Sequence, residues 1–227
     1  MRGIVPDPGN PWPHDMVITI EDDAFPLIEL LWVREAWGLH PPPGGPPRLT
    51  RTPARIGEPE DRAEWETAWP ALWEGAVQHA AAPPDPALFA ALASDQVGSD
   101  QVGSDQVGSD QVGSDERAAL VRAYTGPTWP DHFGPASLGK AFDEWNRAER
   151  EQRLALAAAP QGVSASPERL ALDALVIAWE AGLTRVVTIP CRGAGTRIIG
   201  DASLLLTEST RRSPAEYSEA LRRFAQA

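Results

Sequence analysis

The most reactive side chain in the sequence belongs to its one cysteine, Cys191, in the segment 190–197 (PCRGAGTR). A thiol beside Arg192 and near Arg197 can have a lowered pKa and act as a nucleophile, because neighbouring cations stabilise the thiolate. The two arginines can instead bind an anion, together with backbone N–H groups that the glycines present. Against both hypotheses, no histidine is close in sequence, and an ordinary β-turn explains the glycines equally well. We favour the turn, and keep Cys191 as a candidate nucleophile and Arg192 and Arg197 as candidate binding residues.

A second candidate site is the segment 129–133 (WPDHF), in which an acid and a histidine are adjacent and flanked by aromatic residues. Asp131 and His132 could act as a general base or form part of a binding loop, with Trp129 as an apolar contact. The alternative, which we favour, is that Asp131 caps a turn and the aromatic side chains anchor the loop to the core. Adjacent residues cannot easily ligate one metal ion together, and the four histidines show no ligand-type spacing. The sequence therefore predicts no metal site.

Three tryptophans at four-residue spacing, Trp65, Trp69 and Trp73, fall on one side of a predicted helix. Such a stripe is usually part of a core, and an exposed aromatic platform for a ligand is the alternative. We prefer core packing, because indole rings supply a large buried area with one N–H group to satisfy.

Composition and charge restrict the classes of function. The hydrophobic share of 42% is enough for a core, and the formal charge of −12 argues against a nucleic-acid backbone or an anionic membrane as the main partner. Another protein, in particular a basic one, is compatible with this charge, and the sequence leaves the oligomeric state open. The basic residues are almost all Arg, and Ala, Gly and Pro are abundant, which indicates a bacterial source with a GC-rich genome.

The sequence also carries signals of location and of cofactor use. A single cysteine cannot form an intrachain disulfide, the N-terminus has no apolar signal-peptide region, and no apolar stretch is long enough to cross a bilayer. We therefore expect a cytoplasmic protein. Local signatures of serine hydrolases, kinases, nucleotide-binding loops, zinc fingers and helix-turn-helix proteins are absent, so no cofactor is predicted.

The clearest feature of the chain is a fourfold repeat of QVGSD at residues 96–115, directly after a Ser-Asp pair. Each unit ends in the same Ser-Asp pair, so the helix cap before Glu116 is the same with or without the repeat. This pattern predicts a flexible insertion that expanded a tolerated surface loop between helices at 86–93 and 116–124. The repeat is too short for a β-solenoid and lacks the nine-residue period of calcium-binding Gly/Asp repeats.

The remaining pattern predicts a mainly helical α+β protein. Apolar periodicity, caps and breakers predict helices at about 24–37, 60–81, 86–93, 116–124, 137–158 and 167–181, and one from Pro214. Segments rich in β-branched and aliphatic residues predict a small antiparallel sheet formed by residues 16–21, 184–190, 196–199 and 203–207. We expect one domain over residues 1–227, with two lobes at 15–94 and 116–227 as the alternative division.

No motif identifies a specific activity, and two hypotheses of different classes remain. The first, which we favour, is a non-catalytic protein that binds another macromolecule as an accessory, inhibitory or immunity-like factor. Its basis is an acidic, tryptophan-rich chain without an active-site signature. The alternative is a small enzyme with a dispersed site, in which Cys191, Arg192 and Arg197 converge with Asp131 and His132. A buried Cys191 would count against the enzyme, and an exposed one in a pocket near a histidine or carboxylate would favour it.

Overall fold

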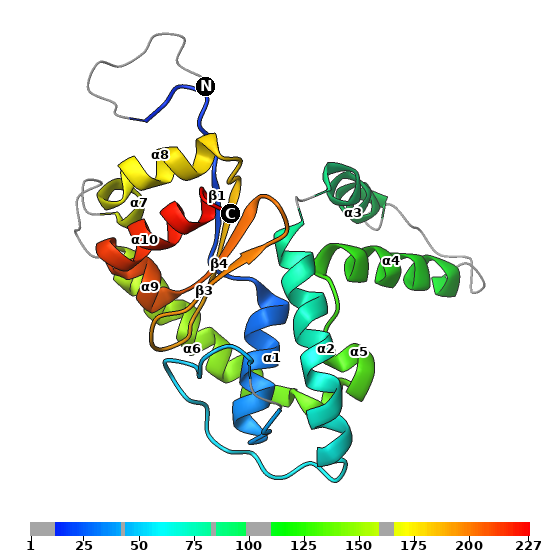
Figure 1. The fold of residues 1–227 in the computed structure, drawn as a ribbon. Coiled ribbons are helices and arrows are strands. Elements are labelled where there is room, and N and C mark those ends of the chain that lie inside the picture. The colour runs from blue at the N-terminus through cyan, green and yellow to red at the C-terminus, as the bar shows by residue number, and fades with distance from the viewer. Residues whose placement is uncertain (1–11, 42–43, 83–84, 99–109, 159–165) are drawn as a thin grey trace.

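The computed structural model describes residues 12–41, 44–82, 85–98, 110–158 and 166–227, and it shows a small sheet between two groups of helices (Figure 1). The helices are α1 (Phe25–Ala36), α2 (Arg62–Ala81), α3 (Pro86–Gly98), α4 (Asp110–Thr125), α5 (Pro130–Phe133), α6 (Gly139–Ala158), α7 (Pro167–Leu170), α8 (Leu172–Glu180), α9 (Glu208–Arg212) and α10 (Pro214–Phe224), with a 3₁₀ turn, η2, at Pro135–Ser137. The strands are β1 (Thr19–Glu21), β2 (Arg185–Ile189), β3 (Thr196–Ile199) and β4 (Ser203–Thr207). The predicted class, α+β and mainly helical, is confirmed.

The sheet is mixed, so the predicted antiparallel sheet is wrong. The strand order is β1-β2-β4-β3; β2 is parallel to both of its neighbours, and only β3 and β4 pair antiparallel. The prediction assumed that the CRGAG segment joins two adjacent strands as a hairpin. Residues 190–195 instead carry the chain past the position of β4 to the sheet edge, and β4 returns between β2 and β3. The hairpin in this sheet is β3–β4, whose turn contains Gly200 with φ of 57°.

Helices cover both faces of the sheet, because successive side chains of β2 and β4 point to opposite sides. Val187 and Leu205 pack in one buried cluster with α1 and α2. Val186 and Leu204 pack in a second cluster with α8 and α10, on the other side. Burial on both faces explains why β2 and β4 contain consecutive apolar residues, at 186–187 and 204–206, rather than an alternating pattern.

Some of the helix caps and bounds that the sequence suggests are present in the structure, and others are not. Ser166 and Ser213 cap α7 and α10, each accepting a hydrogen bond from the backbone N–H three residues later. Asp23 does not cap α1; its carboxylate instead lies 2.6 Å from Nη2 of Arg150 and 3.1 Å from Nη2 of Arg153, both on α6. The helix predicted from residue 167 is interrupted between α7 and α8. No helix in the described part of the chain is long and apolar enough to cross a membrane.

Helices α3 and α4 pack against each other and stand away from the rest of the molecule (Figure 1). We call this pair the arm. Both helices extend further into the repeat than predicted, α3 to Gly98 and α4 from Asp110. Adding one residue to an existing helix gains a hydrogen bond without a new nucleation cost, which explains why the repeat residues next to each helix are helical. The predicted flexible insertion otherwise falls on residues 99–109, which lie outside the described residues.

Candidate functional site

The turn around Cys191 holds another part of the chain in place. Cys191 forms an isolated antiparallel bridge with Leu49, and backbone hydrogen bonds join Arg192 N–H to the Arg48 carbonyl and Thr50 N–H to the Pro190 carbonyl. Residues 44–59, which we call the connector, thereby pair with the segment that follows β2. Cys191 is fully buried, and burial raises the pKa of its thiol to about 12. A thiol that stays protonated at neutral pH is a poor nucleophile.

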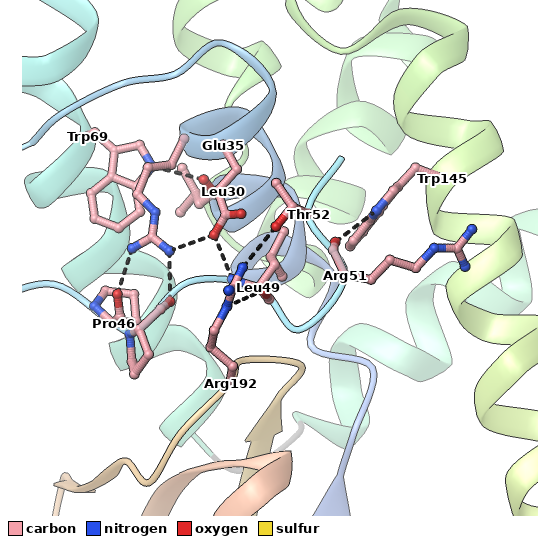
Figure 2. Close-up of polar contacts among 11 residues, drawn as sticks. Leu30, Glu35, Pro46, Leu49, Arg51, Thr52, Trp69, Trp145 and Arg192 are labelled. Carbon is pink, nitrogen blue, oxygen red and sulfur yellow. Dashed lines mark hydrogen bonds and ion pairs between the residues drawn. The ribbon is translucent and has the colours of Figure 1, made fainter. Parts of the chain in front are cut away.

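Arg192 also binds the connector. Its Nε donates to the carbonyl of Leu49 at 3.2 Å, and its Nη2 donates to Oγ1 of Thr52 at 2.9 Å (Figure 2). Both of these acceptors belong to the connector. The structure therefore gives Arg192 a positioning role for the connector.

A buried ion pair that the sequence analysis missed completes this contact. Arg34 donates to the carbonyls of Pro46 and Pro47 at 2.6 and 2.7 Å (Figure 2). Glu35 Oε1 accepts from Leu49 N–H at 2.5 Å and from Arg34 Nη2 at 3.2 Å. The guanidinium carbon also lies 5.5 Å from the centre of the Trp69 ring. A buried ion pair is favourable only when its remaining donors and acceptors are also satisfied. The connector backbone supplies three such partners here, whereas Glu35 Oε2 is buried without a hydrogen-bond partner among the described residues. Adjacent charged residues in the last turn of an otherwise apolar helix were the signal for this network in the sequence.

Arg197 does not share a partner with Arg192. Its two terminal nitrogens bind the two carboxylate oxygens of Glu74 on α2, each at 2.7 Å. This hydrogen bonding lowers the pKa of Glu74 and raises that of Arg197. Arg197 also lines a cavity of about 290 Å³ at the end of β2 and β4. The two arginines of the predicted anion site are thus directed to different parts of the molecule.

The segment 129–133 is anchored to α1 and forms the short helix α5. Trp129 is fully buried, and its backbone N–H donates to Glu29 Oε1 at 2.5 Å. Asp131 accepts from the backbone and hydroxyl of Thr128 at 3.1 and 2.5 Å, whereas His132 is exposed. Burial raises the pKa of the Glu29 carboxyl to about 7, against the opposing effect of the Trp129 hydrogen bond. Glu29 was not among the residues that the sequence pointed to.

The two predicted sites remain separate in the described part of the chain. No hydrogen bond or ion pair between described residues joins Asp131 or His132 to the segment 190–197. Nor do three His, Cys, Asp or Glu side chains of these residues come together in a group that could hold a metal ion.

A larger cavity of about 560 Å³ lies where the arm meets the body. Phe25, Leu88 and Tyr124 contribute apolar surface to its wall, and Glu21 and Arg185 contribute charge. Nη1 of Arg185 lies 3.8 Å from Oε2 of Glu21 and 3.5 Å from the carbonyl of Ala80. The wall comes from β1, α1, α2, α3, α4 and β2, so no local sequence pattern could have indicated this cavity.

No protein-family model, no curated protein and no solved structure matches this chain.

Proposed function

We propose that this protein acts by binding another macromolecule, and that the arm and the cavity at its base form the contact surface. One observation carries the proposal: three large apolar side chains of the arm are exposed. Phe89 on α3 is 63% exposed, and Val121 and Tyr124 on α4 are 41% and 48% exposed. Soluble proteins rarely leave neighbouring apolar side chains uncovered unless the surface binds something.

The sequence of α3 supports this proposal. The helix begins Pro-Ala-Leu-Phe-Ala-Ala-Leu-Ala, which is apolar on all sides, and such helices are normally buried. Yet none of the described side chains of the arm, which belong to residues 85–92 and 117–125, is buried. A partner that covers α3 would provide the burial that its residues 86–92 do not have in the part of the chain that the structure describes.

The cavity at the base of the arm supplies a pocket for an anchoring side chain. Tyr124 belongs both to the exposed apolar set and to the cavity wall, so the two features are continuous. Interfaces commonly gain most of their binding energy from a few apolar side chains that enter such pockets. A cavity of about 560 Å³ is large enough for an aromatic or long aliphatic side chain.

Charge indicates the nature of the partner. Residues 86–116 contain six acidic residues and neither Lys nor Arg, within a chain of formal charge −12. Complementary charge accelerates encounter and selects between partners. The partner we propose is a protein with an apolar patch bordered by basic residues.

Site-specific photo-cross-linking tests this proposal. A benzophenone amino acid at Phe89, in the cells that produce the protein, is expected to capture one stoichiometric partner. The same amino acid at Leu170, which is 54% exposed on α7, is the matched control and is expected to capture nothing reproducibly. The substitution Phe89→Ser should reduce co-purification of the partner at least tenfold, whereas Leu170→Ser should leave it unchanged. Equal capture at both positions, or no effect of Phe89→Ser, would contradict the proposal.

A further inference from the structure

The cavity at the end of β2 and β4 has a position where parallel sheets bind ligands. β2 and β4 are parallel neighbours that end at Ile189 and Thr207, and both residues line the cavity of about 290 Å³. In sheets with parallel strands, small molecules bind outside the carboxyl ends of the strands, where the following loops diverge. This cavity is separate from the arm, and its use does not depend on the function proposed above.

One wall of this cavity is the end of an aromatic stack. The rings of Trp69 and Trp73 are stacked with 5.4 Å between centroids and 6° between planes, and Trp73 lines the cavity. Arg34 lies over the Trp69 ring and is itself bound to the connector. The Trp73 indole is therefore held in place before any ligand arrives. Trp73 is 4% exposed, and the small part of the indole that reaches the cavity provides an apolar contact for a ring.

Glycines form part of another wall of the cavity, and they add no side chain to it. Gly44 and Gly45 precede Pro46 and Pro47, and all four residues line the cavity. Gly195, on the other side, must be glycine, because a Cβ atom there would lie 2.8 Å from Cγ2 of Thr207. The space beside Gly195 is thus filled by Thr207, whereas at Gly44 a Cβ atom would meet no heavy atom within 4 Å, so this position leaves open space for a ring.

The charge on the cavity wall indicates which chemical group a ligand of this cavity should carry. Of the described residues that form the wall of this cavity, only Arg197 is charged; Glu74, to which it is bound, does not line the cavity. The side chains of Arg197 and Glu74 are 42% and 50% exposed, so a second carboxylate can reach the pair and compete with Glu74 for the guanidinium. A carboxylate in the cavity can therefore bind the guanidinium in the bidentate geometry that Glu74 now uses.

We propose that this cavity binds a small aromatic carboxylate, with its ring against Trp73 and between the glycine and proline walls, and its carboxylate on Arg197. The hydroxyl group of Thr196, which also lines the cavity, offers a further hydrogen-bonding position for a heteroatom of the ring, whereas the Thr207 hydroxyl is already bonded to Gly193 and Thr210. One cavity thus combines an apolar contact with Trp73, a space without side chains and the single positive charge of Arg197.

Titration calorimetry of the full chain with indole-3-carboxylate tests the proposal, with indole as the neutral probe. Indole-3-carboxylate is expected to bind, and Arg197→Met should weaken it about tenfold, the usual effect of losing a charge-assisted hydrogen bond. The same substitution should leave the weaker binding of indole unchanged. Arg223→Met, which removes an exposed ion pair on α10, is the matched control and should change neither affinity.

Filling the cavity provides the second arm of the test. Gly45 does not have a left-handed φ, and a Cβ atom there would lie 3.6 Å from the Trp69 ring, so Gly45→Leu can place a side chain in the space without strain. This variant should lose binding of both probes; Thr196→Trp, from another wall, serves the same purpose if Gly45→Leu does not fold. Absence of binding to the wild-type protein, or binding that neither Arg197→Met nor a filled cavity weakens, would overturn the proposal.

Discussion

The carboxyl end of the sheet and the arm differ in how far their side chains are buried and bonded to the rest of the protein. At the end of the sheet, Arg34, Glu35 and Arg192 form hydrogen bonds with the backbone of the connector. Cys191, which pairs with the connector, is buried. In the arm, none of the described side chains is buried, and the exposed ones include a phenylalanine. Cys191 and Arg192, which suggested chemistry in the sequence, therefore hold a proline-rich segment in place, whereas helix α3, which carries no motif, supplies part of the exposed apolar surface.

The largest expected effect concerns the buried ion pair at the end of the sheet. Arg34→Met should lower the free energy of unfolding by about 3–5 kcal/mol, because it leaves the Glu35 carboxylate buried without its cation and two carbonyls without a donor. Urea unfolding followed by tryptophan fluorescence measures the change. The matched control, Arg212→Met, breaks an exposed ion pair within α9 and should cost less than about 1 kcal/mol. Similar losses in both variants would mean that the connector is not held by Arg34.

A smaller effect is expected at Glu29, which anchors the segment that follows the arm. Its pKa in the folded protein, about 7, is higher than the ordinary value of 4.5, so the folded state holds this proton more tightly than the unfolded state. The Glu29 contribution to stability is therefore lost as the pH rises from about 4.5 to about 7. Glu29→Gln keeps an acceptor for the Trp129 N–H and should be more stable than the wild type at pH 8 by about 3 kcal/mol.

The difference between the two proteins should disappear towards pH 4.5, and urea unfolding over the range pH 4.5–8 measures it. Because the two proteins share every other titrating group, the difference isolates Glu29. Parallel pH profiles would show that this carboxyl does not titrate in the folded protein as its burial implies.

Deleting residues 96–115 should have the smallest effect on stability. None of the described side chains of the arm belongs to either buried cluster, so we expect that shortening it leaves both cores intact. We expect Tm to change by less than about 3 °C, which for a chain of this size corresponds to less than about 1 kcal/mol. Differential scanning calorimetry of the deletion variant beside the full chain measures this change. A loss of more than about 5 °C would mean that the repeat packs on the body of the protein.

Local signals predicted the elements of this fold better than their arrangement. The strands at 196–199 and 203–207 and the capped helix α10 follow from β-branched or aliphatic runs and from a Ser-Pro start, and all three are present. The parallel pairing of β2 with β4 could not be predicted, because it depends on where residues 190–195 take the chain. Local patterns cannot distinguish a hairpin turn from a longer crossing.

The candidate sites show the same limit. Cys191 looked reactive because two arginines are close in sequence, but its environment is set by Leu49 and Arg34, far away along the chain. Asp131 was expected to cap a turn, and its contacts with Thr128 are of that local kind. Both cavities take their walls from several separate segments, so their existence depends on the tertiary fold alone.

Hydrogen–deuterium exchange of the isolated protein tests the central contrast most directly. Amides of β2 and β4, together with those of Thr50 and Arg192, should exchange close to the rate of global unfolding, because their hydrogen bonds lie in or beside the core. Amides at 86–92 and 117–125 should exchange roughly a hundredfold faster, since the arm can open without disturbing either core. Equal protection in both regions would contradict the account, because it would mean that the apolar surface of the arm is already covered in the isolated protein.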